Sequence, residues 1–181
     1  VLNARPLAAV VLDVASGNTG EVTVSPAQVT FEPEDWDTPQ TITVTGVNDS
    51  PPVVDGPQAV DVTVAVSAAD SDDAWDSLPD QTVTVTNADN DEPGFTLSET
   101  SLAVSEDGTS RTVTAVLNAR PLAAVVLDVA SGNAGEVAVS PAQIKFEPED
   151  WDTPQTITVT GVNDSPPVSD GPQAVDVPVA V

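Results

Sequence analysis

The heptapeptide Gln155-Thr156-Ile157-Thr158-Val159-Thr160-Gly161 (QTITVTG) alternates branched apolar side chains with threonine. Successive side chains of a β-strand point to opposite faces, so Ile157 and Val159 would face a core while the threonines face water. The same seven residues occupy positions 40–46. The stretch therefore predicts a sheet with one buried face, and the chain carries it twice.

The repetition extends far beyond this heptapeptide. Residues 1–66 align with 116–181 without a gap, at a period of 115 residues, and 60 of the 66 positions are identical. The six differences are Thr19/Ala134, Thr23/Ala138, Val29/Ile144, Thr30/Lys145, Val54/Ser169 and Thr63/Pro178. Such a repeat is typical of long arrays of one unit. We expect residues 1–90 to form a first repeat that lacks its first strands, and 91–181 a second that lacks its last strand or strands.

Alternating apolar residues, separated by turns rich in Gly, Pro, Asn and Asp, predict strands through the rest of the period. The predicted strands are Thr96–Ser105, Arg111–Leu117, Leu122–Val129, Glu136–Val139, Gln143–Phe146, Gln155–Gly161 and Gln173–Val181, with Gln81–Asn87 as a last strand of the first copy. Seven or eight short strands in one period favour an all-β fold of antiparallel sandwiches with Greek-key connections. The aromatic residues beside the EPEDW turn are expected to pack against the core: Phe31, Trp36, Phe146 and Trp151.

Composition excludes several classes of function. The 181 residues include 29 Asp and Glu against four Lys and Arg, a net charge of −25. A nucleic-acid binder needs a basic face, and a membrane-spanning helix needs about 18 consecutive apolar residues. The chain has neither, so we expect no nucleic-acid partner and no direct membrane insertion. It has no Cys, His or Tyr, which removes disulfides and the commonest catalytic bases and thiol nucleophiles. We expect no enzymatic activity.

The acidic residues are concentrated in two predicted loops, NADNDEPG at 87–94 and SAADSDDAWDS at 67–77. Two carboxylates about 4 Å apart repel by roughly 4 kcal/mol at an effective dielectric near 20, so a crowded group favours a cation. Calcium takes six to eight oxygen ligands and tolerates irregular geometry. The alternative is that Asp, Asn and Gly simply form good turns. We expect that alternative for the isolated residues Asp13, Asp61, Asp80 and Asp128.

Strand direction predicts which loops meet. In a sandwich of alternating strands, the loop at 48–56 and the end of the first repeat would face the turn at 147–153 of the second. The sequence therefore predicts a Ca²⁺ clamp at the joint. The candidate ligands, at the joint and in the other acidic loops, are Asp49, Asp55, Asp70, Asp72, Asp73, Asp76, Asp89, Asn90, Asp91, Glu92, Glu106, Asp107, Glu149, Asp150, Asp152, Asp164 and Asp170.

The order of motifs carries a family resemblance. The run VTFEPEDWDTPQTITVTGVNDSPPVVDGPQ, followed by SAADSDDAWDSL and QTVTVTNADND, resembles the Calx-beta-like repeats of giant bacterial surface adhesins, as does FTLSETSLAVSEDGTSRTVTAVLN. Trp75 stands where Tyr is usual, and Pro57 and Pro172 follow Gly where an acidic residue is common, which removes a ligand from that loop. The resemblance implies an immunoglobulin-like sandwich that binds calcium and serves as a spacer in a secreted adhesin of the RTX type.

From these observations we expect a calcium-stabilised extender whose partners are adjacent identical repeats of the same polypeptide. It would hold a distal ligand-binding region away from the surface of a Gram-negative bacterium, for adhesion and biofilm formation. Two alternatives remain: a repeat that itself binds a glycan or protein, and a calcium-sensing module. Strand edges left open by the incomplete repeats would be completed by strands from neighbouring molecules.

Overall fold

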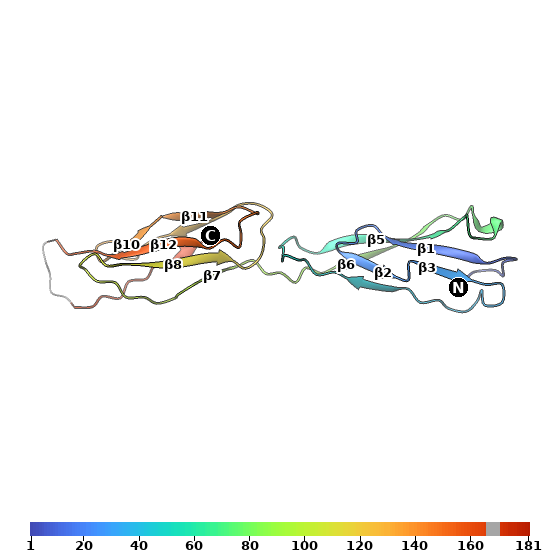
Figure 1. The fold of residues 1–181 in the computed structure, drawn as a ribbon, viewed down its shortest axis with the longest axis horizontal. Coiled ribbons are helices and arrows are strands. Elements are labelled where there is room, and N and C mark those ends of the chain that lie inside the picture. The colour runs from blue at the N-terminus through green and yellow to red at the C-terminus, as the bar shows by residue number, and fades with distance from the viewer. Residues whose placement is uncertain (166–170) are drawn as a thin grey trace. The chain divides into compact units, whose positions relative to one another are not determined.

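The computed structural model describes residues 1–165 and 171–181, and these form an all-β fold of antiparallel sheets (Figure 1). Within the described residues the helical element is the single 3-10 turn η1 (Asp73–Trp75). The chain divides into two compact units. Unit 1 comprises Val1–Ser50 and Asp55–Asn90, and unit 2 comprises Pro51–Val54 and Asp91–Val181.

Unit 1 is built around a four-stranded sheet. The strands β1 (Val10–Ser16), β3 (Gln28–Phe31), β5 (Gln58–Val66) and β6 (Gln81–Asn87) lie in the order β3-β1-β5-β6. A separate pair is formed by β2 (Val22–Ser25) and β4 (Thr43–Gly46). The core has two clusters, one around Val10 and Phe31 and one around Val14, Val22 and Val60.

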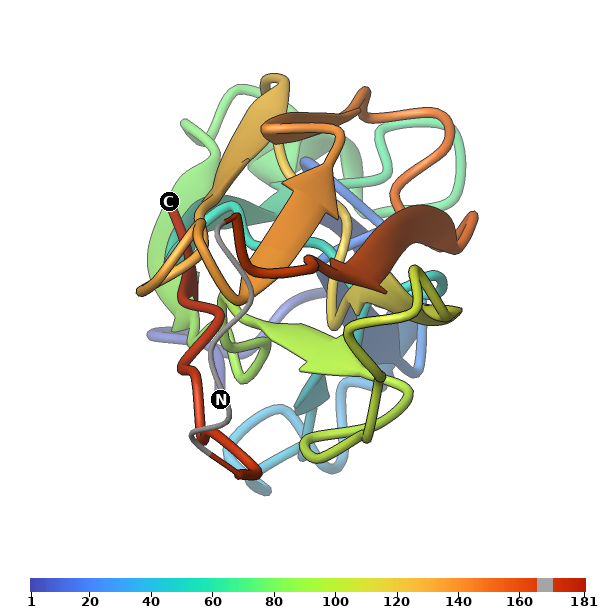
Figure 2. The ribbon, with the colours of Figure 1, turned by 90° about the vertical axis from the view of Figure 1, so that its left-hand side faces the viewer.

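Unit 2 contains two sheets that share one core. The first has the order β10-β12-β8-β7, and the second has the order β11-β9-β13. The strand bounds are β7 (Phe95–Leu97), β8 (Ser110–Leu117), β9 (Val125–Val129), β10 (Val137–Ser140), β11 (Gln143–Phe146), β12 (Gln155–Gly161) and β13 (Val179–Ala180). Leu127 and Phe146 from one sheet pack with Ala115 and Ile157 from the other, the arrangement expected of a β-sandwich. The strands of this unit are shown from a second direction in Figure 2.

The heptapeptide QTITVTG has different neighbours in the two copies. In unit 2 it forms β12 between β10 and β8, and Ile157 and Val159 are only 1% and 4% exposed. In unit 1 only Thr43–Gly46 is a strand; it pairs with β2 alone in the described sheets, and Val44 is 40% exposed. The burial of this segment therefore depends on β8, which lies upstream of the second copy.

Two predicted strands are much shorter than expected. The prediction over Thr96–Ser105 is wrong beyond Leu97: Leu102 and Val104 pack against the core, but the ladder pairing of this edge strand stops. The prediction over Gln173–Val181 is wrong before Val179, because Pro178 has no N–H to donate to a neighbouring strand. The aromatic prediction is confirmed. Phe31 and Phe146 are buried, and both tryptophans of the EPEDW turns pack against the cores.

Candidate metal centre

Asp72, a predicted calcium ligand, is an acceptor of backbone hydrogen bonds. Its Oδ2 accepts from Leu7 N at 2.7 Å and Ala8 N at 3.2 Å, and its Oδ1 accepts from Ala74 N at 3.1 Å. The bond from Ala74 leads those that lower the pKa of Asp72 below its usual value, followed by the bonds from Leu7 and Ala8. Asp72 thus caps η1 and fastens its loop to the start of the chain.

The carboxylates of the NADNDE segment have the same kind of partner within each unit. In unit 1, Asp89 Oδ2 accepts from Gly56 N at 2.7 Å and Asp55 N at 3.1 Å. Gly56 has a φ of +76°, a conformation that glycine adopts readily. In unit 2, Asp91 Oδ2 accepts from Val53 N at 2.9 Å. Each of these aspartates satisfies half-buried N–H groups of a proline-rich loop, for which ordinary turn chemistry suffices.

Arg120 is a residue of this region that the sequence analysis did not single out. In unit 2 its N–H donates to Pro52 O at 2.8 Å, its C=O accepts from Val54 N at 3.1 Å, and its Nε donates to Pro148 O at 3.1 Å. A hollow of about 350 Å³ lies beside it, lined also by the predicted ligands Glu149 and Asp152. An exposed guanidinium, held by one hydrogen bond, thus stands where the sequence predicted only carboxylates. The signal in the sequence was that Arg120 is one of four cationic residues in the chain.

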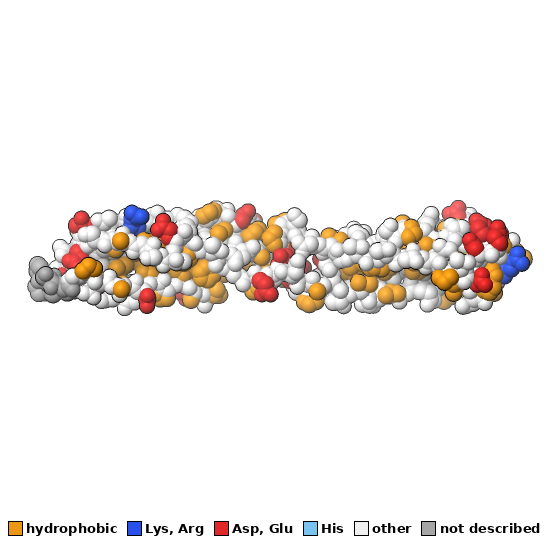
Figure 3. All heavy atoms as spheres, turned by 90° about the horizontal axis from the view of Figure 1, so that it is seen from below, with side chains coloured by type: hydrophobic (Ala, Val, Ile, Leu, Met, Phe, Trp, Pro, Cys, Tyr) orange, Lys and Arg blue, Asp and Glu red, His pale blue; other side chains and the backbone are white. Residues whose placement is uncertain are grey.

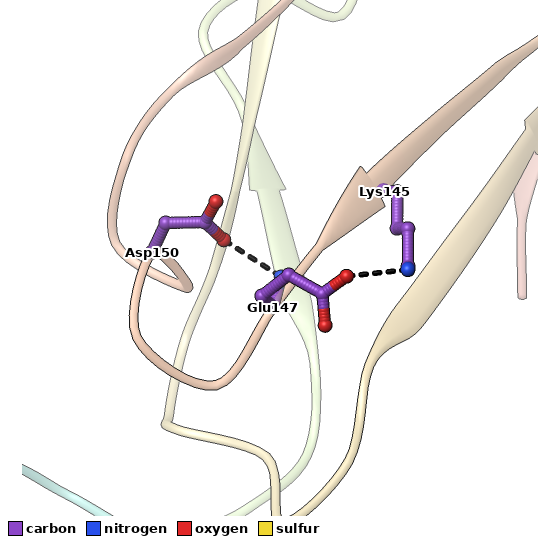
Figure 4. Close-up of polar contacts among 3 residues, drawn as sticks. All are labelled: Lys145, Glu147 and Asp150. Carbon is purple, nitrogen blue, oxygen red and sulfur yellow. Dashed lines mark hydrogen bonds and ion pairs between the residues drawn. The ribbon is translucent and has the colours of Figure 1, made fainter.

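In the turn after β11, Asp150 also caps backbone. Its Oδ1 accepts from Glu147 N at 2.7 Å, and the Glu147 carboxylate forms an ion pair with Lys145 (Figure 4). This contact, first through the hydrogen bond and then through charge, raises the pKa of Lys145. The first copy has Thr30 in place of Lys145, so the ion pair belongs to the second copy alone.

The turn at 105–109 contains two further predicted ligands. The Asp107 carboxylate accepts from the Thr109 hydroxyl and from Thr109 N, and these bonds lower its pKa. Glu106 lies beside it in the turn and is partly exposed. Asp164 differs from these acidic residues, since its Oδ2 is shielded from solvent and has no hydrogen-bond partner in the described part of the chain.

The remaining predicted ligands are dispersed. Asp70 Oδ2 accepts from Ser67 Oγ at 3.1 Å, while Asp73 lies in the first turn of η1 and Asp76 at its C-terminal end. Asp49, Asn90 and Glu92 lie in segments without regular structure, and Asp170 is outside the described residues. Three isolated aspartates expected in turns lie on strands instead and accept cross-strand hydrogen bonds from neutral side chains. They are Asp13, Asp61 and Asp128.

The donor set fits calcium in its chemistry, because it consists of carboxylate and carbonyl oxygens. It is not gathered into a cage: across residues 1–165 and 171–181 no group of three or more acidic residues stands close enough to hold a metal ion. On the face shown in Figure 3 the carboxylates are spread over both units. A shell of six to eight oxygens would therefore need carbonyls, water, or loops drawn together by the ion.

No protein-family model matches this chain, and a search of the curated proteins finds no similar sequence. Among the described residues, no helix is long and apolar enough to cross a membrane.

Proposed function

We propose that the chain is part of an extender: a string of immunoglobulin-like Greek-key repeats that adds length between a cell surface and a distal binding region. The observation that carries this proposal is that one duplicated sequence contributes to two compact units, each with its own hydrophobic core. Units that fold around separate cores can be duplicated in tandem without a change in their sequence. A strand of nine residues such as β5 spans about 30 Å at 3.3 Å per residue, and loops add to this length.

Calcium is the ion that we propose to stabilise the repeats. Its support is the net charge of −25 and the density of aspartate in the loops that end the strands. Carboxylate oxygens are ligands that Ca²⁺ prefers, and Asp72, Asp89 and Asp91 place such oxygens in these loops. The shielded Oδ2 of Asp164 is a further candidate ligand.

The setting that we propose is a secreted adhesin on the surface of a Gram-negative bacterium, acting in adhesion and biofilm formation. The motif order that resembles Calx-beta-like adhesin repeats supports it, as does the absence of cysteine, which leaves metal or burial as the means of stabilising an exported fold.

Thermal unfolding with 10 mM Ca²⁺ and with chelator tests the calcium proposal. Extracellular calcium modules have dissociation constants of about 10⁻⁴ to 10⁻³ M, so a site at the tight end stabilises by about 2.7 kcal/mol at this concentration. For a unit of this size that corresponds to a rise in melting temperature of at least about 10 °C. The double variant Asp89→Asn/Asp91→Asn should lose part of the rise. Asp13→Asn/Asp128→Asn removes the same charge from strand positions and should keep it.

Equal melting temperatures with calcium and with chelator would reject the calcium proposal. Small-angle scattering of a longer multi-repeat polypeptide tests the extender, whose maximum dimension should grow in proportion to repeat number. Binding of the repeats to a glycan array would favour the ligand-binding alternative. A steep, reversible change at micromolar calcium would favour the sensor.

A further inference from the structure

The second copy of the repeat presents a strand edge that is covered in the first copy. In unit 1, β5 pairs with β1 on one side and with β6 on the other, in a register that places Val62 opposite Val83. Residues 173–181 repeat the sequence of β5 with Pro178 as their one difference. In the described part of unit 2 this segment pairs with β9, and no strand pairs with its outer edge.

That edge is already held in register against β9. Gly132 N donates to Asp176 O at 2.8 Å and Ala130 N to Pro178 O at 3.2 Å, and in unit 1 Gly17 N donates likewise to Asp61 O at 2.8 Å. The N–H and C=O of one residue in an antiparallel strand point to the same side, and successive residues alternate. Val175, Val177 and Val179 therefore direct their backbone groups to the outer edge. The N–H that Pro178 lacks would have pointed to β9, so the outer row of donors is intact.

A large hollow lies beside this edge. It has a volume of about 1100 Å³, and its walls are residues 97–106 and 171–179 over side chains of β8, β10 and β12. Protein interiors are close-packed, so a hollow of this size beside an unpaired strand edge has room for a further chain segment. Val175 and Val177 are half-buried, whereas their counterparts Val60 and Val62 in unit 1 are 4% and 3% exposed. Hydrophobic side chains of unit 2 are visible at the surface in Figure 3.

In unit 1 the covering strand supplies both apolar and polar contacts. Val85 of β6 packs against the cluster that contains Val60 and Val62. Thr84 Oγ1 donates to Asp61 Oδ1 at 2.7 Å, and the counterpart of Asp61 in unit 2 is the exposed Asp176.

The loop that precedes β6 adds a second set of contacts. Ser71 Oγ accepts from Val11 N at 2.9 Å, and Asp72 accepts from Leu7 N and Ala8 N. Residues 122–126 of unit 2 have the same sequence as 7–11. Unit 2 thus has backbone groups for both sets of contacts, along residues 173–181 and along residues 122–126.

We propose that unit 2 binds, as an added antiparallel strand, the segment Ser67–Asn87 of another copy of the repeat. The register is the one that unit 1 shows, with Val83 of the incoming strand opposite Val177 and Thr84 opposite Asp176. Main-chain hydrogen bonds supply the affinity, and the inward valines together with the Asp72 contacts supply the specificity. This site does not depend on the calcium proposal.

Disulfide capture tests the site on the full chain, which has no cysteine of its own. An Asp176→Cys chain is mixed with a synthetic peptide of residues 67–87 that carries Thr84→Cys. An Asp61→Cys chain is the matched control, because β6 already covers that position in unit 1. We expect capture by Asp176→Cys to be at least about tenfold faster than by Asp61→Cys, since only one edge is open. Equal rates for the two chains, or equal rates for the peptide and a scrambled version, would overturn the proposal.

Peptide variants without cysteine test the register on the unmodified chain. The N–H of Val83 points to β5 in unit 1, and that of Thr82 points away from it. By fluorescence anisotropy with a labelled peptide, Val83→Pro should weaken binding about tenfold, the loss expected for one ladder donor, and Thr82→Pro much less. Equal binding of the two variants would show that the peptide does not join the sheet. A disulfide dimer of Asp176→Cys chains that excludes the peptide would replace the proposal with edge-to-edge pairing of two chains.

Discussion

The two copies of QTITVTG allow one perturbation to be made twice in the same sequence. Val159→Ala and Val44→Ala each remove two methyl groups, from side chains that are 4% and 40% exposed. At about 0.8 kcal/mol per buried group, the transfer cost for Val159 is about 1.6 kcal/mol, and the cavity left in the core raises it to about 2–2.5 kcal/mol. For Val44 the transfer cost is about 1 kcal/mol, and water fills the space. Both substitutions replace valine with alanine on a strand, so the loss of strand propensity is the same and cancels when the two losses of stability are compared.

The measurement is urea unfolding with a separate reporter for each unit, because two units need not unfold in one transition. Trp151 is partly buried against the core of unit 2, and Trp36 and Trp75 are partly buried against the core of unit 1. A chain with both unit 1 tryptophans changed to Phe reports Val159→Ala, and a Trp151→Phe chain reports Val44→Ala. The urea concentrations at the unfolding midpoints are compared between variant and parent, provided that the dependence of the unfolding free energy on urea concentration is unchanged.

The reasoning fails if the two losses agree within about 0.5 kcal/mol, which is the usual size of a surface effect. Equal losses would mean that Val44 is covered in solution, so that unit 1 acquires a covering strand. A larger loss of stability for Val44→Ala would contradict the inference that pairing with β8 is what buries the heptapeptide in unit 2.

Three further outcomes follow from particular contacts. Asp72→Asn should lower the melting temperature at pH 7, and the gap in melting temperature between variant and parent chain should shrink as the pH falls below 3.8. Folding lowers the pKa of Asp72, so the stabilisation by its carboxylate is complete above pH 3.8 and is lost as the pH falls through the pKa of the folded state. A series of melts at different pH with a constant gap would contradict this expectation. Gly161→Ala should lower the free energy of unfolding in urea by about 1–3 kcal/mol, because the new Cβ would lie 2.1 Å from the backbone oxygen of Ser105. Gly46→Ala should lower it less, because its Cβ would meet the flexible amide side chain of Asn87. A larger loss for Gly46→Ala would refute this reasoning. Pro178→Thr should lengthen β13 and slow amide exchange in residues 173–181, measured by NMR, and unchanged exchange would show that the missing N–H does not limit the strand.

The sequence predicts the strands well where alternation coincides with two neighbouring strands. Gln81–Asn87, Gln143–Phe146 and Gln155–Gly161 have the predicted bounds. It fails over Ser98–Ser105, where the apolar residues still alternate but the ladder has ended. Alternation reports which face of a segment is buried. It does not report whether another strand lies alongside, and that depends on residues far away in the chain.

The acidic residues show the same limit. Their place in turns is readable from the sequence, and the caps formed by Asp72, Asp107 and Asp150 fit that reading. The partners of Asp89 and Asp91 are not readable, because they are backbone N–H groups more than 30 residues away. Arg120 was overlooked for a related reason. Composition marks it as one of four cationic residues, but two of the three hydrogen bonds described above run through its backbone, and the sequence does not show the partners of a backbone group.

The repeat that the sequence displays is therefore not the unit that folds. The 66 aligned residues give a buried β12 only where β8 precedes them, and a fully paired β5 only where β6 follows. Both of these strands come from the stretch between the two copies, and each serves a different unit. Each copy thus gains a neighbouring strand from residues outside it, so an additional 67–115 stretch should stabilise an existing copy. In repeat proteins, stability is the sum of the stability of each repeat and of its interactions with its neighbours. A strand edge without its neighbour is then a weak point of a unit and also an edge with which a further strand can pair.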